Sequence, residues 1–98
     1  MITEIAEIGV KPGMEEKFAA GVEACKPVFL RAPGCHGVAL HRSIEHPQQF
    51  LLMIKWESVA HHMEQFRNSA DYGLWREAVG ECFAGEVKLQ HTETVVSS

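Results

Sequence analysis

Residues 49–57, QFLLMIKWE, are the stretch from which the fold can be read. A strand with one solvated face alternates apolar and polar side chains, and this stretch does not. One side of the predicted strand presents four large apolar side chains: Phe50, Leu52, Ile54 and Trp56. The other side presents Leu51 and Met53, so both faces of the strand need cover. Helices can cover one face, and we predict that a second copy of the chain covers the other in a homodimer.

The segments before and after this strand predict further strands and a first helix. Strands are expected at residues 2–10, 36–44 and 86–94, which are rich in β-branched residues or alternate in polarity. A helix is expected where apolar side chains recur every three or four residues: Met14, Phe18, Val22, Cys25 and Phe29. Pro27 lies inside that pattern and predicts a kink or an early end, because proline removes a backbone donor.

A second helical region is broken into two parts. Ser58 is a suitable N-cap for the first part, whose shared face is expected to hold Val59, His62, Met63 and Phe66. Asn68 and Ser69 interrupt the pattern and offer a second cap. The second part has an apolar stripe of Tyr72, Trp75, Val79 and either Cys82 or Phe83, and it ends by Gly85.

The resulting order, β-α-β-β-α-β, predicts an α+β ferredoxin-like fold. In this fold both helices cover one face of a four-stranded antiparallel sheet. The 98 residues amount to a single domain, with residues 95–98 as a tail that frays.

Composition excludes several functional classes. The formal net charge of −4 argues against nucleic acid as a partner. The longest uninterrupted apolar run, residues 50–54, is far shorter than the roughly 20 residues that cross a bilayer, so no membrane partner is expected. The N-terminus does not read as a signal peptide. Three cysteines without CxxC spacing favour reduced thiols and a cytoplasmic location.

Several short motifs, in their order along the chain, resemble those of one family. They are Lys11-Pro12-Gly13, Pro33-Gly34-Cys35, Trp56-Glu57-Ser58, His62, Phe66-Arg67, Ser69, Tyr72 and Trp75-Arg76. Together they resemble antibiotic biosynthesis monooxygenase (ABM) domains over roughly residues 1–94. The resemblance implies a dimeric α+β barrel in which two ferredoxin-like sheets face each other. It also implies a pocket in each subunit between the sheet and the helices.

Members of this superfamily oxygenate polycyclic aromatic polyketides or quinols without flavin or metal. The resemblance therefore implies a cofactor-independent monooxygenase that acts on a small quinol or polyphenolic aromatic with dioxygen. The motif positions that carry over are His62, Phe66, Ser69, Tyr72 and Trp75.

Cofactor-free oxygenation needs a dry cavity, a base near neutral pKa and donors that hold the substrate anion. His62 is the candidate catalytic base, because the ordinary pKa of histidine is close to neutral. Packing at a helix–sheet contact is the alternative for this side chain. Phe66, Tyr72 and Trp75 are expected to bind the aromatic substrate, with core packing as the alternative.

Other polar residues on the strands are further candidates. His91 shares a face with apolar neighbours and is expected to be partly buried near the substrate. His41 could point at the pocket or at the dimer interface. Glu4 and Glu7 lie three apart on a strand, so one of them faces inward and needs a partner or a raised pKa. Trp56 is expected to pack in the core, and Arg67 and Arg76 at the surface.

No cofactor is expected. The sequence has no HxH or HxxxH pair for a metal and no GxGxxG after a strand for a dinucleotide. Relatives that degrade haem carry a ligating histidine late in the second helical segment, and here no histidine lies between His62 and His91. The alternative to an oxygenase is a dimeric small-molecule-binding or stress-related protein that uses the same pocket without turnover.

Overall fold

The computed structural model describes residues 1–98 and has the predicted order of elements. The strands are β1 (Ile2–Gly9), β2 (Cys35–Arg42), β3 (Gln49–Trp56) and β4 (Lys88–Thr92). The helices are α1 (Glu15–Leu30) and α2 (Ala70–Val79), with a π-helical segment η1 (His61–Phe66) before α2 and a 3-10 turn η2 (Gly80–Cys82) after it. All strand pairs are antiparallel in the order β2-β3-β1-β4, which confirms the ferredoxin-like α+β fold.

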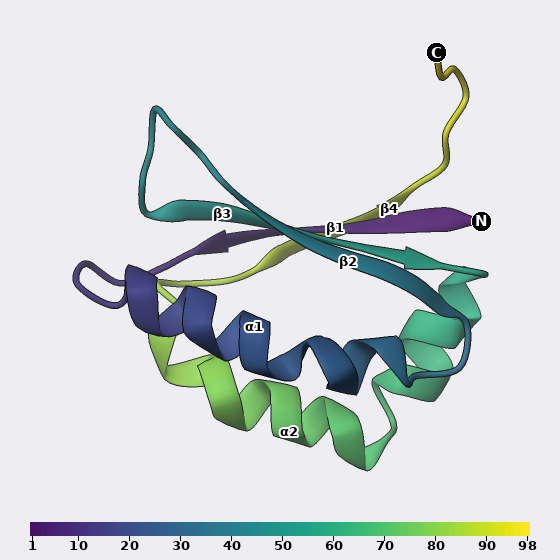
Figure 1. Ribbon diagram of the computed structural model, residues 1–98, viewed down its shortest axis with the longest axis horizontal. Coiled ribbons are helices and arrows are strands. Elements are labelled where there is room, and N and C mark those ends of the chain that lie inside the picture. Colours follow the sequence, from purple (N-terminus) through teal and green to yellow (C-terminus); the bar gives the residue numbers. More distant parts are fainter.

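Both helices lie on one side of the sheet, and the other side carries no helix (Figure 1). Along β3, the four side chains on the helix side are 3% exposed or less: Phe50, Leu52, Ile54 and Trp56. Leu51 and Met53 lie on the side without helices and are half-buried. The two apolar faces predicted for residues 49–57 are therefore present. We call them the covered face and the open face of the sheet.

The predicted break between the two helical parts is confirmed. The hydroxyl of Ser69 accepts a hydrogen bond from the backbone N–H of Tyr72 at 3.3 Å and so caps α2. The Ser58 hydroxyl accepts the backbone N–H of His61 at 3.3 Å in the same way. Gly85 follows η2 with φ +106°, a conformation that glycine adopts at low cost, and the chain turns there toward β4. The stripe of α2 buries Trp75, Val79 and Cys82.

Two local expectations differ from the structure. Of the kink or early end expected at Pro27, the early end is wrong, because α1 continues to Leu30. Pro27 lies in the last turn and is exposed, so water can bond the backbone carbonyl that loses its partner. Val59 is 44% exposed and does not join the buried face of the following helix. The chain there forms the wider i→i+5 turns of η1, as in the bond from Arg67 N–H to His62 O at 3.0 Å, and this turn buries only His62 and Phe66.

No helix of this fold combines the length and the hydrophobicity needed to cross a membrane.

Candidate functional site

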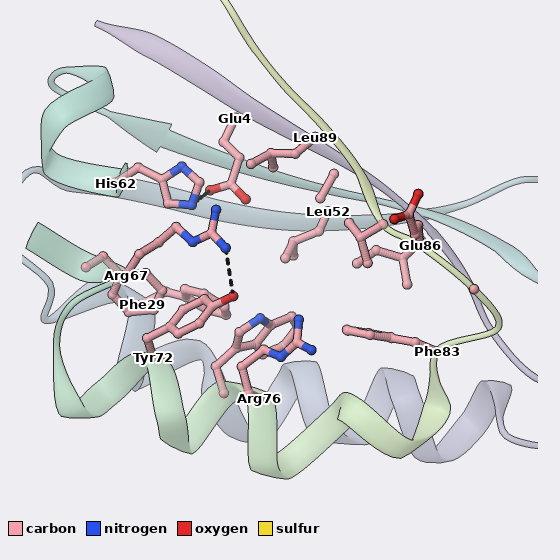
Figure 2. A pocket seen from close by; sticks show the side chains of 16 residues that line it. Glu4, Phe29, Leu52, His62, Arg67, Tyr72, Arg76, Phe83, Glu86 and Leu89 are labelled. Carbon is pink, nitrogen blue, oxygen red and sulfur yellow. Dashed lines mark hydrogen bonds and ion pairs between the residues drawn. The ribbon is translucent and has the colours of Figure 1, made fainter. Parts of the chain in front are cut away.

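A cavity of about 510 Å³ lies between the covered face of the sheet and the layer formed by η1, α2 and the segment before β4. Ten of its 16 lining residues are hydrophobic, which suits a largely apolar ligand. The exposed polar residues of its lining are Arg67, Arg76 and Glu86. Arg76 lies on α2, Arg67 lies just before α2, and Glu86 lies just before β4. The cavity therefore opens to solvent between these elements (Figure 2).

Aromatic side chains form the helix-side wall of this cavity. Phe66, Tyr72 and Trp75 all line it, as do Phe29 and Phe83. The rings of Phe66 and Tyr72 meet edge to face at 5.8 Å, and those of Phe29 and Trp75 at 4.9 Å. Such contacts restrict the ring orientations, so the aromatic wall is preformed.

The sheet side contributes a buried carboxyl, Glu4, which is 5% exposed. Its Oε1 accepts a hydrogen bond from Trp56 Nε1 at 2.9 Å and lies 3.3 Å from His62 Nε2. Burial raises the pKa of Glu4 to about 7, although the bond from Trp56 and the charge of Arg67 oppose the shift. Glu4 is therefore the inward member of the predicted pair, and Glu7 lies on the open face opposite Leu51.

His62 joins this carboxyl to a second histidine. Its Nδ1 lies 2.9 Å from His91 Nε2, and its ring stacks on that of Trp56 at 5.4 Å. Burial, with the nearby His91 and Arg67, lowers the pKa of His62 to about 4. The imidazole is therefore neutral at pH 7, with Nδ1 hydrogen-bonded to His91 and Nε2 facing the Glu4 carboxyl. We call this row of three neighbouring side chains, Glu4, His62 and His91, the relay.

Sequence reasoning left the place of two histidines open. His91 lies on β4 and reaches His62, but it is not among the residues that line the cavity. His41 pairs with Leu51 and is exposed on the open face, so of the two positions left open it takes the one away from the cavity and does not line it as a substrate-binding residue. The reason is the two-residue period of the strand, which turns His41 away from the helices.

Three features of the site were missed in the sequence. Arg67 and Arg76 are exposed as expected, but they also line the cavity, which was not foreseen. Trp56 is buried in the core as expected, and it also donates the hydrogen bond that holds Glu4. A usable signal existed for the arginines, since each directly follows an aromatic residue of the wall, Phe66 or Trp75.

Comparisons with a family model and with solved structures indicate the same family. Residues 1–78 match the model of the family described as antibiotic biosynthesis monooxygenase. The crystal structure of a proposed antibiotic biosynthesis monooxygenase from Bordetella bronchiseptica is similar at 55% identity and a TM-score of 0.96, with 97% of each chain covered. The uncharacterized protein YczJ of Bacillus subtilis is 25% identical, over 97% of this chain and 100% of its own.

A further structure, from Nitrosomonas europaea, shares the fold at a TM-score of 0.82 and 21% identity, over 98% of this chain and 100% of its own. The family match covers residues 1–78, which is most of the chain. The chain belongs to the antibiotic biosynthesis monooxygenase family.

Proposed function

We propose that this protein is a monooxygenase that oxidises a quinol or polyphenolic aromatic with dioxygen and uses no cofactor. The family and the name of the Bordetella bronchiseptica relative support oxygenase chemistry in general. The observation that carries the finer proposal is a buried carboxyl of near-neutral pKa, Glu4, opposite an aromatic wall in an apolar cavity.

In this proposal Glu4 takes the phenolic proton of the substrate. A general base works best when its pKa lies near the operating pH, and the pKa of Glu4 at about 7 meets this condition better than that of His62 at about 4. His62 then acts as the hydrogen-bond partner of the base. While Glu4 is ionised, His62 Nε2–H donates to it, and Nδ1 accepts from His91.

Once Glu4 holds the substrate proton, the relay returns it to the carboxylate through the tautomer of His62 that carries its proton on Nδ1. His62 Nε2 accepts the proton of Glu4 as Nδ1–H gives its own proton to His91 Nε2, so His62 stays neutral and is left with its proton on Nε2. His91, which is half-buried, then gives up one proton to solvent. Arg67 and the hydroxyl of Tyr72, which lie 3.4 Å apart, are placed to stabilise the phenolate that forms.

The substrate supplies all the electrons for the reaction. Its anion gives one electron to dioxygen, and the two radicals combine at a ring carbon to form a C–O bond. Loss of the hydrogen on that carbon and cleavage of the O–O bond leave a carbonyl and release water. A phenol with a free ring C–H plus dioxygen thus gives a quinone plus water, which balances atoms and electrons without an added reductant.

We also propose that the protein is a homodimer whose two open faces meet. The open face carries Leu51 and Met53 on the strand next to β1, whose Ile5 pairs with Met53. These half-buried apolar side chains are suited to burial against a second copy. Leu51→Asp places a charge there and should turn a dimer into a folded monomer in light scattering. A wild-type protein that is monomeric at micromolar concentration contradicts this arrangement.

Oxygen uptake by purified, metal-free protein tests the reaction over a panel of quinols and anthrone-like phenols. His62→Ala should slow turnover per folded molecule, because Glu4 loses the partner through which its proton leaves. His41→Ala on the open face is the matched control. Activity and melting temperature are measured on the same samples. A lower melting temperature with unchanged turnover would make His62 a packing residue, and binding without any uptake would favour a protein that holds its ligand without converting it.

A further inference from the structure

Two arginine side chains reach the cavity without an acidic partner. The guanidinium of Arg67 donates to the hydroxyl of Tyr72 at 3.4 Å and to the sulfur of Met63 at 3.8 Å, it lies over the Tyr72 ring, and it forms no ion pair. Arg76 has no hydrogen bond or ion pair from its guanidinium, which lies 5.4 Å from the centre of the Phe83 ring. Figure 2 shows both guanidinium groups directed into the cavity.

The arginines outside the cavity are bonded differently. Arg31 forms a two-pronged ion pair with Asp71, at 2.8 and 2.7 Å. Arg42 stacks on Phe50 at 5.4 Å, as Arg76 does on Phe83, but it also donates to the carbonyl of Pro47 at 2.6 Å. Of the four arginines of the chain, the two that line the cavity are thus the ones without a strong acceptor.

Two carboxyl groups also face the cavity and must be accounted for. Glu4 is held by Trp56 and His62, and it forms no ion pair with either arginine. Glu86 is exposed and forms no ion pair, and Figure 2 shows it across the cavity from Arg76. A planar guanidinium presents several N–H donors that match a carboxylate, so the open donors of Arg76 can be satisfied by a ligand.

The two arginines lie at different positions along the cavity. Arg67 is close enough to Glu4 and His62 to affect both electrostatically, and it shares Tyr72 with the proposed reaction. Arg76 stands farther along α2, between the aromatic wall and Phe83 (Figure 2). One cation is therefore placed beside the reacting hydroxyl, and the other is placed to hold a different part of the same molecule.

We infer that the substrate is an anionic aromatic, whose permanent carboxylate binds Arg76 while its phenol lies between Glu4 and Arg67. This rests on the proposed function for the phenol, and the carboxylate is the new element. The rings lie between the aromatic wall and Leu52 and Leu89 of the sheet, all of which line the cavity. Neutral quinols of the same size leave Arg76 unsatisfied and bind more weakly.

The test is a binding titration that requires no turnover. The probes are anthraquinone-2-carboxylate and its neutral counterpart, 2-(hydroxymethyl)anthraquinone, followed by quenching of tryptophan fluorescence, since Trp75 lines the cavity. Wild type should bind the carboxylate about tenfold more tightly, the usual order for a hydrogen bond to a charged group, and the preference should shrink as salt is added. Arg76→Gln should remove the preference.

Arg42→Gln is the matched control, because it removes a cation stacked on a phenylalanine outside the cavity, and it should keep the preference. Equal affinities in wild type, failure to bind either probe, or a preference that survives Arg76→Gln overturns the inference. Oxygen uptake with neutral and carboxylated quinols separates it from the proposed function. Equal oxidation of neutral and carboxylated quinols would support the proposed monooxygenase function and contradict the inferred carboxylate site. Tighter binding of the carboxylate without any oxidation would support the carboxylate site and contradict the monooxygenase function.

Discussion

The two faces of the sheet carry similar residues but give them different properties. On β1, Glu4 on the covered face is 5% exposed, accepts a hydrogen bond from Trp56 and lies 3.3 Å from His62, whereas Glu7 on the open face is half-buried and has no ion pair. On β3, Leu52 is 2% exposed, and its neighbour Leu51 is only half-buried. Each comparison is between two residues of the same type, two glutamates or two leucines. Their different burial therefore comes from the helices, which pack on the covered face and not on the open face.

Burial under the helices gives an ordinary carboxyl its unusual chemistry. It raises the pKa of Glu4 to about 7 and lowers that of His62 to about 4, in both cases by disfavouring the charged form. With a pKa near 7, Glu4 is present in both its ionised and its protonated form at neutral pH, so it can take a proton and give it up again, whereas His62 stays neutral. We therefore assign reaction chemistry to the covered face and association to the open face.

The largest expected effect follows from exchanging the two glutamates for glutamine. Glu4→Gln removes the proposed base but keeps an oxygen that can accept from Trp56, so turnover should fall by about 10²–10⁴ while the fold is retained. Glu7→Gln makes the same chemical change on the open face and should leave the rate within a factor of two or so. Steady-state oxygen uptake on both variants checks this. Equal rates for the two variants would end the assignment of Glu4 as the base.

The two leucines of β3 test the packing side of the comparison. Leu52→Ala should lower the free energy of unfolding by about 2–5 kcal/mol, because it leaves a hole in the core. Leu51→Ala should cost about 1 kcal/mol or less within one chain. Urea denaturation at several protein concentrations measures both. If the open faces form a dimer, only the Leu51→Ala cost should grow with protein concentration, and a cost independent of concentration would count against that interface.

The pH dependence of stability should separate Glu4 from His62. The pKa of Glu4 rises from 4.5 to about 7 on folding, so the folded state binds more protons and Glu4 makes the protein less stable as pH rises through this window. The pKa of His62 falls from 6.5 to about 4, so its contribution becomes more favourable from pH 4 to 6.5. Each contribution amounts to about 3 kcal/mol, and the two oppose each other in wild type.

Removing either group should reveal the contribution of the other. The stability of wild type relative to Glu4→Gln should fall between pH 4.5 and 7, and that relative to His62→Gln should rise between pH 4 and 6.5. Urea denaturation at four or more pH values within this range provides the measurement. Parallel pH curves for wild type and either variant would mean that the group titrates normally in the folded protein.

The smallest effect is expected from the outer end of the relay. His91→Asn shortens the side chain and removes the partner of His62 Nδ1, which should slow turnover by about five- to tenfold, the order of one hydrogen bond. His41→Asn, on the open face, should not change it. Rates measured in ordinary and heavy water sharpen this comparison, since a slowed proton transfer enlarges the isotope effect. An unchanged rate and isotope effect in His91→Asn would confine the relay to Glu4 and His62.

Much of the fold was determined by short-range patterns. The period of two in residues 49–57 set the two faces of β3, and recurring apolar residues set α1 and α2 to within a few positions. The break at Ser69 was visible because a capping hydroxyl acts over three residues. The same reasoning placed one of Glu4 and Glu7 inside and predicted that it needs a partner or a raised pKa, but it could not say which one, because a strand pattern has no absolute direction.

Only the tertiary structure decided which side chains meet. The bond from Trp56 to Glu4 joins residues 52 apart in sequence, and that between His62 and His91 joins residues 29 apart. These contacts depend on strand register and on the wide turn of η1, which also left Val59 exposed. The arginines of the cavity were missed because a long side chain reaches several ångströms from its backbone, so its surroundings are set by neighbouring elements rather than by its own helix face.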